Sequence, residues 1–435
     1  MENFEIDFTY FINPPSLRRR PFLPPSLVDA CDTTSEKSIK LAEGFPNDAN
    51  FPFKEISVLL KDGTSYRLEG EQLATSLHYI PTKGYPPLVS TLKDFTQQIH
   101  QPPYWSQRDV LVTVGSQEAM SKVLEMCLEE GDPILVQNPL YSGIAVVLAP
   151  FQSTLIPINQ DGNGMVPDFL RQALNQRKKE CLLDRQLKMP KILYINPTGA
   201  NPVGTTLPLD RRQEIYRICC DYNILILEDD PYCFMNYKDP TPPSFLSFDI
   251  EGRVIRLDSL SKVLCPGLRI GWVTAAKPLT DVLELGIENC YLSSASLTQV
   301  ITYNLLNGWG VKGTLNYFRS VRDDNKKRRD MMLQSMDLHL KGLCDWSVPD
   351  GGMFAWIKVR DIPEVQDMLL IRGKKKCVTF APGRLYMVDS QKTCSYIRAS
   401  FCRENPKLID KAMQLLAELI LEEKALLKAQ VEKAQ

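Results

Sequence analysis

Residues 258–271 read Asp-Ser-Leu-Ser-Lys-Val-Leu-Cys-Pro-Gly-Leu-Arg-Ile-Gly, and the rest of the chain is organised around this stretch. The residues just before it, 253–257, alternate polar and apolar side chains, which predicts a β-strand. Lys262 therefore lies in the loop at the carboxyl end of that strand. Two hydroxyls and a forked cation, the donors that a phosphate group binds, flank this lysine in the sequence. They are Ser259, Ser261 and Arg269.

A lysine beside a phosphate-binding loop suggests one kind of chemistry. Its amine can form a Schiff base with a phosphorylated aldehyde cofactor. The alternative is that Lys262 is a surface residue and its neighbouring serines are incidental, because short motifs also match by chance. The pattern of the surrounding chain bears on this choice.

From residue 109 onwards, short apolar segments alternate with amphipathic ones, which indicates a mostly parallel sheet covered by helices. The predicted strands of this sheet are 109–114, 133–137, 154–158, 191–195, 223–228, 253–257 and 270–275. The predicted helices include 116–130 with Gly131 as its C-cap, 209–222, 298–308 and 313–341. Two further strands are predicted near 351–356 and 396–401, followed by a last helix that starts at Asn405-Pro406 and has Leu408, Ala412, Leu415, Leu416 and Leu419 on one face.

Polar groups follow five of the predicted strands. Each group alone could be a turn or a helix cap, because Asn, Asp, Pro and Gly are common in turns. In open α/β sheets, however, ligands bind at the carboxyl ends of the strands, so groups that converge there predict one binding site. The five groups are Gly115-Ser116-Gln117, Asn138 to Tyr141, Asn196 to Gly204, Asp229 to Tyr232, and Lys262.

The order Ser-x-Ser-Lys followed by Gly-x-Arg-x-Gly resembles the lysine motif of the fold-type I pyridoxal phosphate (PLP) aminotransferases, class I/II. The wording around Phe51-Pro52-Phe53 and Asp229 to Tyr232 is similar to the kynurenine/α-aminoadipate and fungal-type aromatic branch. The resemblance implies an α/β protein, with a mostly parallel seven-stranded sheet in a large domain and a smaller α+β domain. The implied divisions are an N-terminal arm with part of the small domain (1–65), the PLP-binding domain (66–320) and the C-terminal small domain (321–435).

The resemblance also implies roles for individual residues. Lys262 would bind the cofactor and then act as base and acid, and Asp229 would keep the cofactor's ring nitrogen protonated. Tyr232 and Asn201 would bond its phenolic oxygen, and Arg398 would bind the substrate α-carboxylate. The other implied contacts are Tyr141 stacked on the ring, Ser116, Gln117, Ser259, Ser261 and Arg269 at the phosphate, and Gly44 and Phe354 at the substrate.

Three positions carry further implications. Tyr79 matches the family's Tyr-x-x-x-x-Gly, in which the tyrosine reaches the cofactor phosphate of the partner subunit, so a homodimer is implied. Asp230 is the alternative to Asp229, but its spacing to the following tyrosine differs from the family's Asp-x-x-Tyr. Glu43 stands where the branch has a small residue, which leaves the specificity open.

The composition narrows the class of protein. The chain has 435 residues and a formal net charge of −1, which favours neither nucleic acid nor an anionic membrane as a partner. Its twelve cysteines form no C-x-x-C pair, which is typical of free thiols in a reducing compartment. Only three histidines are present and they lie far apart, so no metal site is expected. The acidic start of the chain and the lack of a long apolar run predict a cytoplasmic protein.

The sequence predicts an aminotransferase that moves the amino group of tyrosine, phenylalanine or tryptophan to 2-oxoglutarate. An apolar wall for the ring would come from Phe354, Trp356, Tyr291, Leu292 and the aromatic residues of the N-terminal arm. The Arg18 to Arg20 run is either solvated or meets the distal carboxylate of the acceptor. The alternatives are a kynurenine or 2-aminoadipate donor, a PLP lyase or decarboxylase, and a non-catalytic ligand-sensing domain, which the missing DNA-binding module disfavours.

Overall fold

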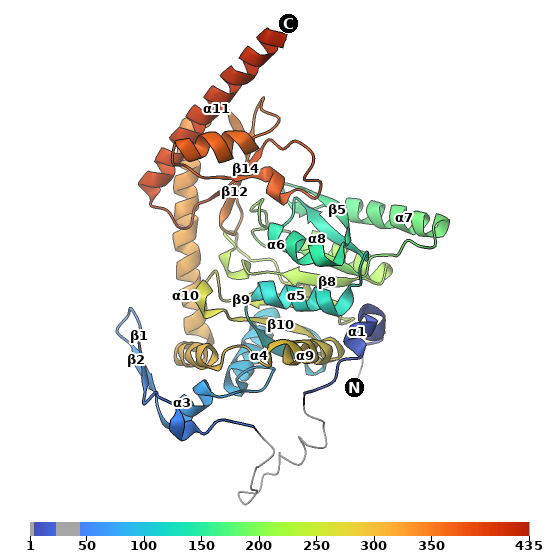
Figure 1. The fold of residues 1–435 in the computed structure, drawn as a ribbon, viewed down its shortest axis with the longest axis vertical. Coiled ribbons are helices and arrows are strands. Elements are labelled where there is room, and N and C mark those ends of the chain that lie inside the picture. Colours follow the sequence, from blue (N-terminus) through green and yellow to red (C-terminus); the bar gives the residue numbers. More distant parts are fainter. Residues whose placement is uncertain (1–3, 23–43, 435) are drawn as a thin grey trace, which may run out of the picture.

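The computed structural model describes residues 4–22 and 44–434. A large domain surrounds an eight-stranded sheet, a smaller domain contains a four-stranded sheet, and a two-stranded hairpin extends from one side (Figure 1). The large sheet consists of β3 (Arg108–Thr113), β4 (Pro133–Asn138), β5 (Thr154–Asp161), β6 (Gly164–Met165), β7 (Ile192–Ile195), β8 (Leu225–Asp229), β9 (Val254–Ser259) and β10 (Gly271–Ala276).

The strand order of the large sheet is β3-β10-β9-β8-β7-β4-β5-β6. Strands β9, β8, β7, β4 and β5 are parallel to one another, whereas β10 is antiparallel to both of its neighbours. The prediction of a mostly parallel sheet is therefore confirmed. The seven predicted strands are all present, and the two-residue β6, antiparallel to β5, adds an eighth at the edge.

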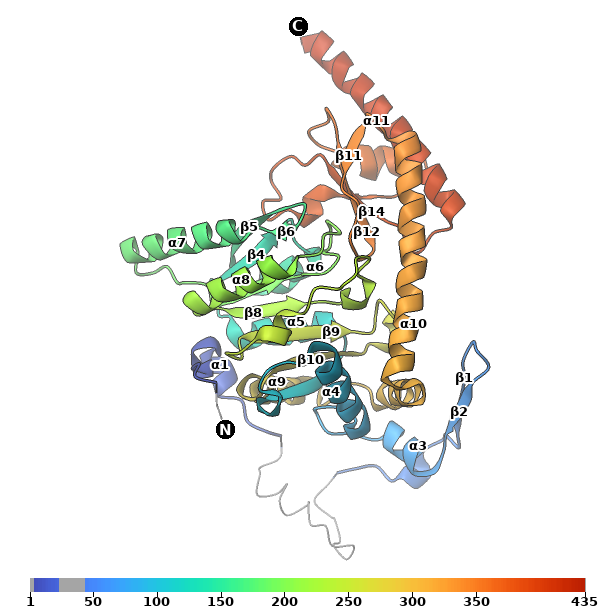
Figure 2. The same ribbon diagram turned by 180° about the vertical axis from the view of Figure 1, so that it is seen from behind.

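Helices cover both faces of this sheet, as the front and back views show (Figures 1 and 2). One face packs against α5, α6 and α9, and the other against α4, α7, α8 and part of α10. The bounds of these helices are α4 (Pro86–His100), α5 (Ser116–Cys127), α6 (Ser142–Leu148), α7 (Pro167–Leu183), α8 (Leu209–Asp221), α9 (Lys277–Tyr291) and α10 (Ser296–His339).

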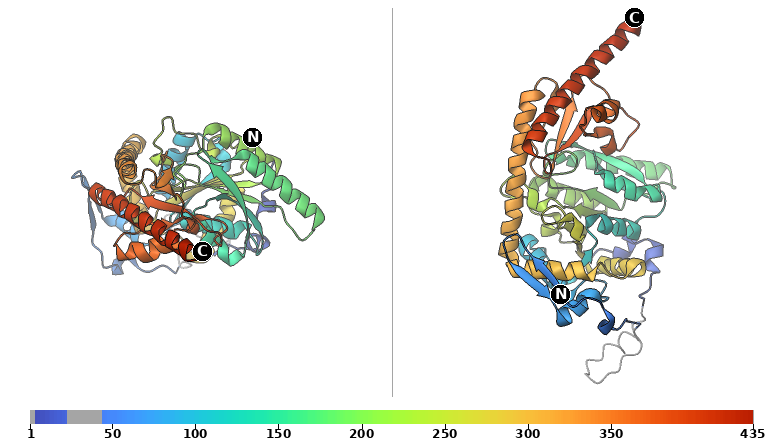
Figure 3. Two further views of the ribbon diagram at one scale, coloured as in Figure 1. Left: turned by 90° about the horizontal axis from the view of Figure 1, so that it is seen from above. Right: turned by 60° about the vertical axis from the view of Figure 1, so that its left-hand side comes forward.

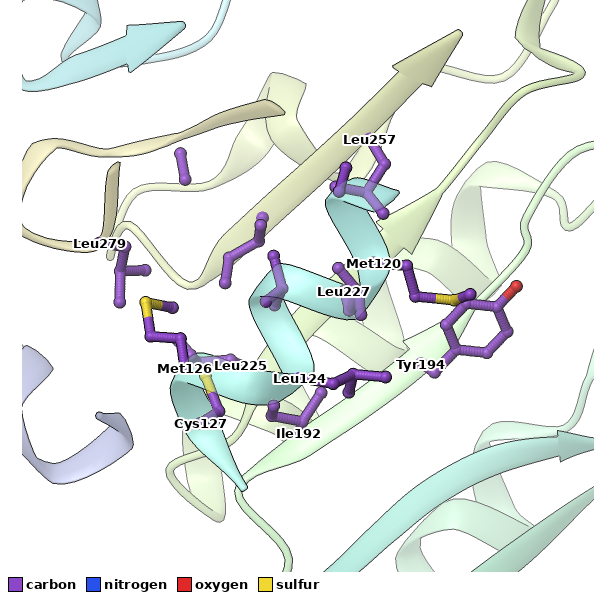
Figure 4. Packing of buried hydrophobic residues seen from close by; sticks show 14 of the residues in the cluster. Met120, Leu124, Met126, Cys127, Ile192, Tyr194, Leu225, Leu227, Leu257 and Leu279 are labelled. Atoms are coloured by element: carbon purple, nitrogen blue, oxygen red, sulfur yellow. The ribbon is translucent and has the colours of Figure 1, made fainter. Parts of the chain in front are cut away.

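Strand β8 shows why the sheet needs helices on both faces. Leu225 and Leu227 point towards α5, where they meet side chains such as Leu124 (Figure 4), whereas Ile226 packs on the α7–α8 side. All of these side chains are fully buried. Burying one such side chain contributes about 1.5–3 kcal/mol, so neither face of the strand could be left in water.

Helix α10 connects the large domain to the small one and runs along much of the molecule (Figure 3). Its backbone is interrupted at Gly310, where φ is +62°, so the two helices predicted at 298–308 and 313–341 meet at this residue. The small-domain sheet has the order β11-β12-β14-β13 and is antiparallel. The remaining elements are β11 (Cys344–Trp346), β12 (Phe354–Val359), β13 (Ala381–Pro382), β14 (Tyr396–Ser400), α11 (Pro406–Ala434), α1 (Pro14–Leu17), β1 (Ile56–Leu59), β2 (Ser65–Leu68) and α3 (Gly70–Leu77).

Several predicted boundaries, and one residue of a predicted helix face, are wrong in detail. Helix α5 ends at Cys127 and not at 130, because Leu128 becomes extended and is buried in the core. Strand β12 begins at Phe354, since the glycines before it form a turn instead of strand. Leu408 is 57% exposed, and α11 faces the core with other residues. These core residues are Ile409, Met413, Leu416, Leu419 and Ile420.

Candidate active site

The carboxyl ends of β8 and β9 border a cavity of about 410 Å³. Twelve of the fourteen predicted site residues line it: Ser116, Gln117, Tyr141, Asn201, Asp229, Tyr232, Ser259, Ser261, Lys262, Arg269, Phe354 and Arg398. Five separate loops and the small domain supply these side chains. Four further residues line the cavity without an individual role predicted for them: Tyr194, Asn196, Pro231 and Pro266.

Asp229 ends β8 and is only 5% exposed. Its Oδ2 accepts a hydrogen bond of 2.8 Å from the Tyr194 hydroxyl, and its Oδ1 is buried with no hydrogen-bond partner in the described part of the chain. Burial, and then the charge of Asp230, raise the pKa of the Asp229 carboxyl from 3.8 to about 7. An unpaired, buried carboxylate oxygen at the cavity wall can accept a hydrogen bond from a protonated, positively charged ring nitrogen of a ligand.

Tyr194 is a site residue that the sequence did not reveal. It lies inside the apolar run of β7, where a tyrosine is normally a core residue, and it packs beside Met120 of α5 (Figure 4). The only sequence signal is its position one residue before the end of a strand whose carboxyl end borders the cavity. Its hydroxyl fixes one oxygen of Asp229 and leaves the other for a ligand.

Lys262 follows β9, as predicted, and its side chain enters the same cavity. Burial and the neighbouring Arg269 lower the pKa of its amine, and the carboxylate of Asp229 opposes them. Because a lowered pKa increases the fraction of neutral amine, Lys262 is suited to attack a carbonyl and to accept a proton.

A phosphate-sized group would meet a set of donors at the other end of the cavity. Ser116 begins α5, whose N-terminal N–H groups and dipole attract anions. The Ser259 and Ser261 hydroxyls are 3.0 Å apart, and Arg269 Nη2 donates to the carbonyl of Val114 at 2.8 Å.

The backbone at Gly115 must stay free of a side chain for this arrangement. Its φ is +84°, and a Cβ there would lie 2.5 Å from Nη2 of Arg269. The glycine therefore lets the guanidinium lie across the start of α5, where it adds a cation to the donors of the helix.

Tyr141 is held at the cavity by a hydrogen bond of 3.0 Å from its hydroxyl to Oε1 of Gln117. The ring lies so close to Gly143 that a Cβ at that position would be 2.3 Å from it. Gln117 in turn donates to the carbonyl of Gly143. This bracing keeps a flat ring at the wall of the cavity, as stacking on a planar ligand requires.

Arg398 comes from β14 in the small domain and crosses to the large one. Its Nη1 donates to Oδ1 of Asn201 at 3.0 Å. Its guanidinium lies between two rings, 4.1 Å from the centroid of Phe354 and 4.7 Å from that of Tyr386. The sequence left open which face of the strand Arg398 occupies, and it did not identify Tyr386, which lies in a short 3₁₀ helix at Gly383–Tyr386. The two rings fix the plane of a group that binds carboxylates in pairs of hydrogen bonds.

Two predicted residues, Gly44 and Tyr79, do not line the cavity of their own chain. Gly44 is exposed, and Tyr79 is 59% exposed beside the Phe45 ring, at a centroid distance of 6.0 Å. The Arg18 to Arg20 run also lies elsewhere, because Arg19 pairs with Glu125 near the end of α5.

The predicted apolar wall is only partly correct. Phe354 lines the cavity, but Trp356 stacks on Tyr396 at 5.1 Å instead, and Tyr291 lies next to Glu118. Phe8 and Phe11 of the N-terminal arm are buried in the core under the large sheet. Alternation along a strand predicts which residues share a face, but it does not say which side chains reach a cavity.

The site therefore has an anion-binding end, a buried carboxylate, an amine of lowered pKa and an arginine held for a carboxylate. These groups match the four parts of a phosphorylated pyridine aldehyde with an amino acid attached: phosphate, ring nitrogen, aldehyde carbon and α-carboxylate. The unpaired Oδ1 of Asp229 is the strongest sign of fit, since it lacks the partner that such a ring would supply.

Comparison with known proteins supports a site of this kind independently of its geometry. The family model for aminotransferase class I and II matches residues 36–416. Kynurenine/alpha-aminoadipate aminotransferase, mitochondrial, of Bos taurus is 38% identical over 423 residues, which cover 96% of this chain and 100% of the relative. An aromatic amino acid aminotransferase of Schizosaccharomyces pombe is 31% identical over 401 residues, with 81% and 84% covered. Among solved structures, the aromatic aminotransferase Aro9 from C. Albicans superposes with a TM-score of 0.86 at 26% identity, with 97% of this chain and 99% of that chain covered.

Proposed function

Since this chain belongs to the class I and II aminotransferases, we propose that it transfers the amino group of an aromatic L-amino acid to 2-oxoglutarate. It is an aminotransferase, and its cofactor is pyridoxal phosphate. The observation that carries the proposal is the placement of Lys262, Asp229 and Arg398 around one cavity with the ring of Phe354. The products of the proposed reaction are the aromatic 2-oxo acid and L-glutamate.

We assign the cofactor-holding roles as follows. The unpaired Oδ1 of Asp229 would accept a hydrogen bond from the protonated ring nitrogen, while the Tyr194 hydroxyl donates to Oδ2. Tyr232 and Asn201, which line the cavity, would bond the phenolic oxygen, and Tyr141 would stack on the ring. The phosphate is held by Ser116, Gln117, Ser259, Ser261 and Arg269.

When bound, the cofactor supplies an electron-withdrawing ring that stabilises negative charge at the substrate Cα. Lys262 Nζ would take the Cα proton of the amino acid as a base and would release that proton again as an acid. The lowered pKa of Lys262 provides the neutral amine for the first step. The Asp229 carboxylate would hold a proton on the ring nitrogen of the bound cofactor, which would keep that nitrogen cationic.

Arg398 orients the substrate for this transfer. Its guanidinium is already held by Asn201 and two rings, so little side-chain freedom is lost when a carboxylate binds. Phe354 offers an apolar face beside that clamp, which suits an aromatic side chain. A kynurenine or 2-aminoadipate donor is the second candidate, because relatives so named match the chain over 95–96% of its length at 36–38% identity.

A donor panel separates the candidates. With 2-oxoglutarate fixed, kcat/KM for tyrosine, phenylalanine and tryptophan is expected to exceed that for kynurenine and 2-aminoadipate, with one glutamate formed per donor consumed. Donor consumption without glutamate would instead indicate the lyase or decarboxylase alternative. A higher kcat/KM for kynurenine or 2-aminoadipate than for all three aromatic donors would replace the proposed substrate and leave the mechanism unchanged.

We further propose a homodimer in which Tyr79 serves the partner's cofactor phosphate. The support is that Tyr79 is exposed and outside its own cavity, close to the exposed ring of Phe45. Removing its hydroxyl in Tyr79→Phe is expected to weaken cofactor binding about 10- to 100-fold, the effect of losing a hydrogen bond to a charged group.

Mixed dimers test whether this hydroxyl acts across subunits. Dimers of Tyr79→Phe and Lys262→Ala have one site with both an intact lysine and an intact tyrosine. That site is expected to regain wild-type cofactor affinity and activity. A fully active monomer in light scattering, or hybrids that regain neither property, would contradict the proposal.

The partners we propose are small molecules, namely the amino acid and the 2-oxo acid. Within the described residues, no helix is long and apolar enough to cross a membrane, and no cluster of metal-ligating side chains is found. A cytoplasmic location is proposed because the eleven described cysteines are free, which suits a reducing compartment. Three relatives are named as mitochondrial, so recovery of the protein with intact mitochondria would refute the cytoplasmic location.

A further inference from the structure

A cluster of fully buried charges lies directly behind the active site. Arg256 of β9 binds Asp258 with Nε and Nη2, at 3.0 and 2.8 Å. Its Nη1 lies 3.1 Å from Glu228 and 3.3 Å from Asp230. All four side chains are at most 2% exposed, so one guanidinium joins three carboxylates in the absence of bulk water.

The register of β8 and β9 explains how this cluster meets the site. Glu228 is the Cα partner of Arg256 in the parallel pair, and Asp258 follows two residues later on the same face of β9. Asp229 lies between Glu228 and Asp230, and Ser259 follows Asp258. Both Asp229 and Ser259 line the cavity. Each of the three acidic partners of Arg256 is thus the immediate chain neighbour of a residue proposed to bind the cofactor.

Without Arg256 the cluster would contain three carboxylates but only one arginine, Arg212. Three carboxylates face Arg256 and a second buried arginine, Arg212, whose Nη1 is 3.9 Å from Glu228. Glu228 also accepts hydrogen bonds from the Ser244 hydroxyl and the Phe245 N–H. With Arg256 lost, the three carboxylates would remain buried, Arg212 would offset only part of their charge, and the potential at Asp229 would become more negative.

We propose that Arg256 is a positioning residue of the active site: it holds Asp230 and Asp258 behind the sheet, and so fixes the ends of β8 and β9 and offsets the negative charge next to Asp229. The inference rests on the cofactor role proposed above for Asp229. Arg256 does not line the cavity, so it acts only through its neighbours.

The electrostatic surroundings of Asp229 agree with this role. Asp230 raises the pKa of Asp229, whereas Lys262 and Arg256 lower it. The other titratable groups that face Asp229 are Tyr194 of β7, Tyr141, Tyr232 and Arg398. Behind the sheet, the groups around Arg256 are Asp258, Glu228, Asp230, Cys233, Arg212 and His100.

The chain offers a matched control at the other end of the sheet. Arg108, the first residue of β3, pairs with Asp249 at 2.9 Å, and both side chains are completely buried. This pair is as dry as the Arg256 cluster but lies at the amino end of its strand, away from the cavity. Loss of either arginine leaves a buried acid unpaired, so both should destabilise the fold.

The test uses holoenzymes of Arg256→Met, Asp230→Asn and Arg108→Met. The pH midpoint at which the absorbance of the bound cofactor changes is measured together with kcat, KM and Tm. Removing a positive charge makes nearby groups hold their protons to higher pH, and removing a negative charge does the opposite. Arg256→Met is therefore expected to raise the midpoint and Asp230→Asn to lower it, each by about one pH unit. For Arg256→Met, kcat is expected to fall at least about tenfold with KM changed by less than about twofold.

A purely structural role gives a different result. Arg256→Met would then lower Tm as Arg108→Met does, and would leave the midpoint and kcat at their wild-type values, which overturns the proposal. If Arg256→Met does not fold, Asp230→Asn decides alone: a lowered midpoint supports the proposal and an unchanged one refutes it. Failure of the assumed cofactor role is recognised separately, because Asp229→Asn would then leave the midpoint of the cofactor unchanged.

Discussion

Replacing Lys262 with alanine is expected to reduce transamination by at least about 10⁴-fold, the upper end of what a positioned acid–base group contributes. The reason is that Lys262 is the amine assigned to both proton transfers and to attack on the cofactor aldehyde. Burial and Arg269 lower its pKa, which increases the fraction of neutral amine compared with a lysine in water. The protein should still bind the cofactor, because the phosphate and ring contacts remain, but without a covalent link.

The measurement is single-turnover conversion of the amino acid with each purified holoenzyme, together with mass spectrometry after borohydride reduction. The control is Lys277→Ala, which removes an exposed lysine at the start of α9 and should change neither result. Turnover of Lys262→Ala at a wild-type rate, or a reduced covalent adduct on another lysine, would refute the assignment.

Replacing Asp229 with asparagine is expected to lower kcat about 10²- to 10³-fold, the effect of losing one preorganised electrostatic group. The side chain keeps its shape, and Tyr194 can still donate to an amide oxygen. What is lost is the negative charge opposite the ring nitrogen, so that nitrogen is no longer held in its cationic form. KM for the amino acid should change little, because the residue proposed to bind its carboxylate is Arg398, which also lines the cavity.

The same substitution is expected to stabilise the apoprotein near neutral pH. In the folded apoprotein Asp229 holds its proton up to pH about 7, whereas the unfolded chain releases it near the ordinary value of 3.8. The folded state therefore binds more protons between these pH values, and its stability falls as the pH rises from 4 to 7, by on the order of 4 kcal/mol. Asparagine lacks this titration.

Thermal melts from pH 4 to 8 test this sign. Apo Asp229→Asn is expected to match the wild-type Tm near pH 4 and to exceed it at pH 8. In the holoenzyme the ionised Asp229 has a cationic partner, so there the substitution should lower Tm. A wild-type apoprotein that is more stable than the variant at pH 8 would show that burial does not raise the pKa of this carboxyl.

The sequence was most informative where local chemistry and strand ends coincide. Lys262, Asp229 and Asn201 each belong to a short polar motif after an apolar strand, so their convergence followed from the rule that parallel strands share a carboxyl edge. Tyr194 and Tyr386 belong to no such motif. Their roles depend on which side chain they meet across the fold, a property of packing that no short pattern contains.

Helix ends and long-range charge clusters were harder to predict for related reasons. Leu128 leaves the helix because it can be buried in the core, a tertiary effect that outweighs the capping signal of Gly131. The pattern of 253–257 predicted a strand but indicated no role for Arg256, and both faces of β9 are buried. A buried arginine looks like an exposed one in sequence until its three acidic partners are placed around it.

Helix α10 has a kink at Gly310 that separates a short segment from a long one. Beyond Gly310 its long arm extends to His339, about 44 Å at 1.5 Å per residue, and the small domain sits at its far end (Figure 3). Arg398 and Phe354 belong to the domain at that end, whereas Lys262 belongs to the other. Because α10 connects the two domains, its direction beyond Gly310 sets where Arg398 and Phe354 lie relative to Lys262.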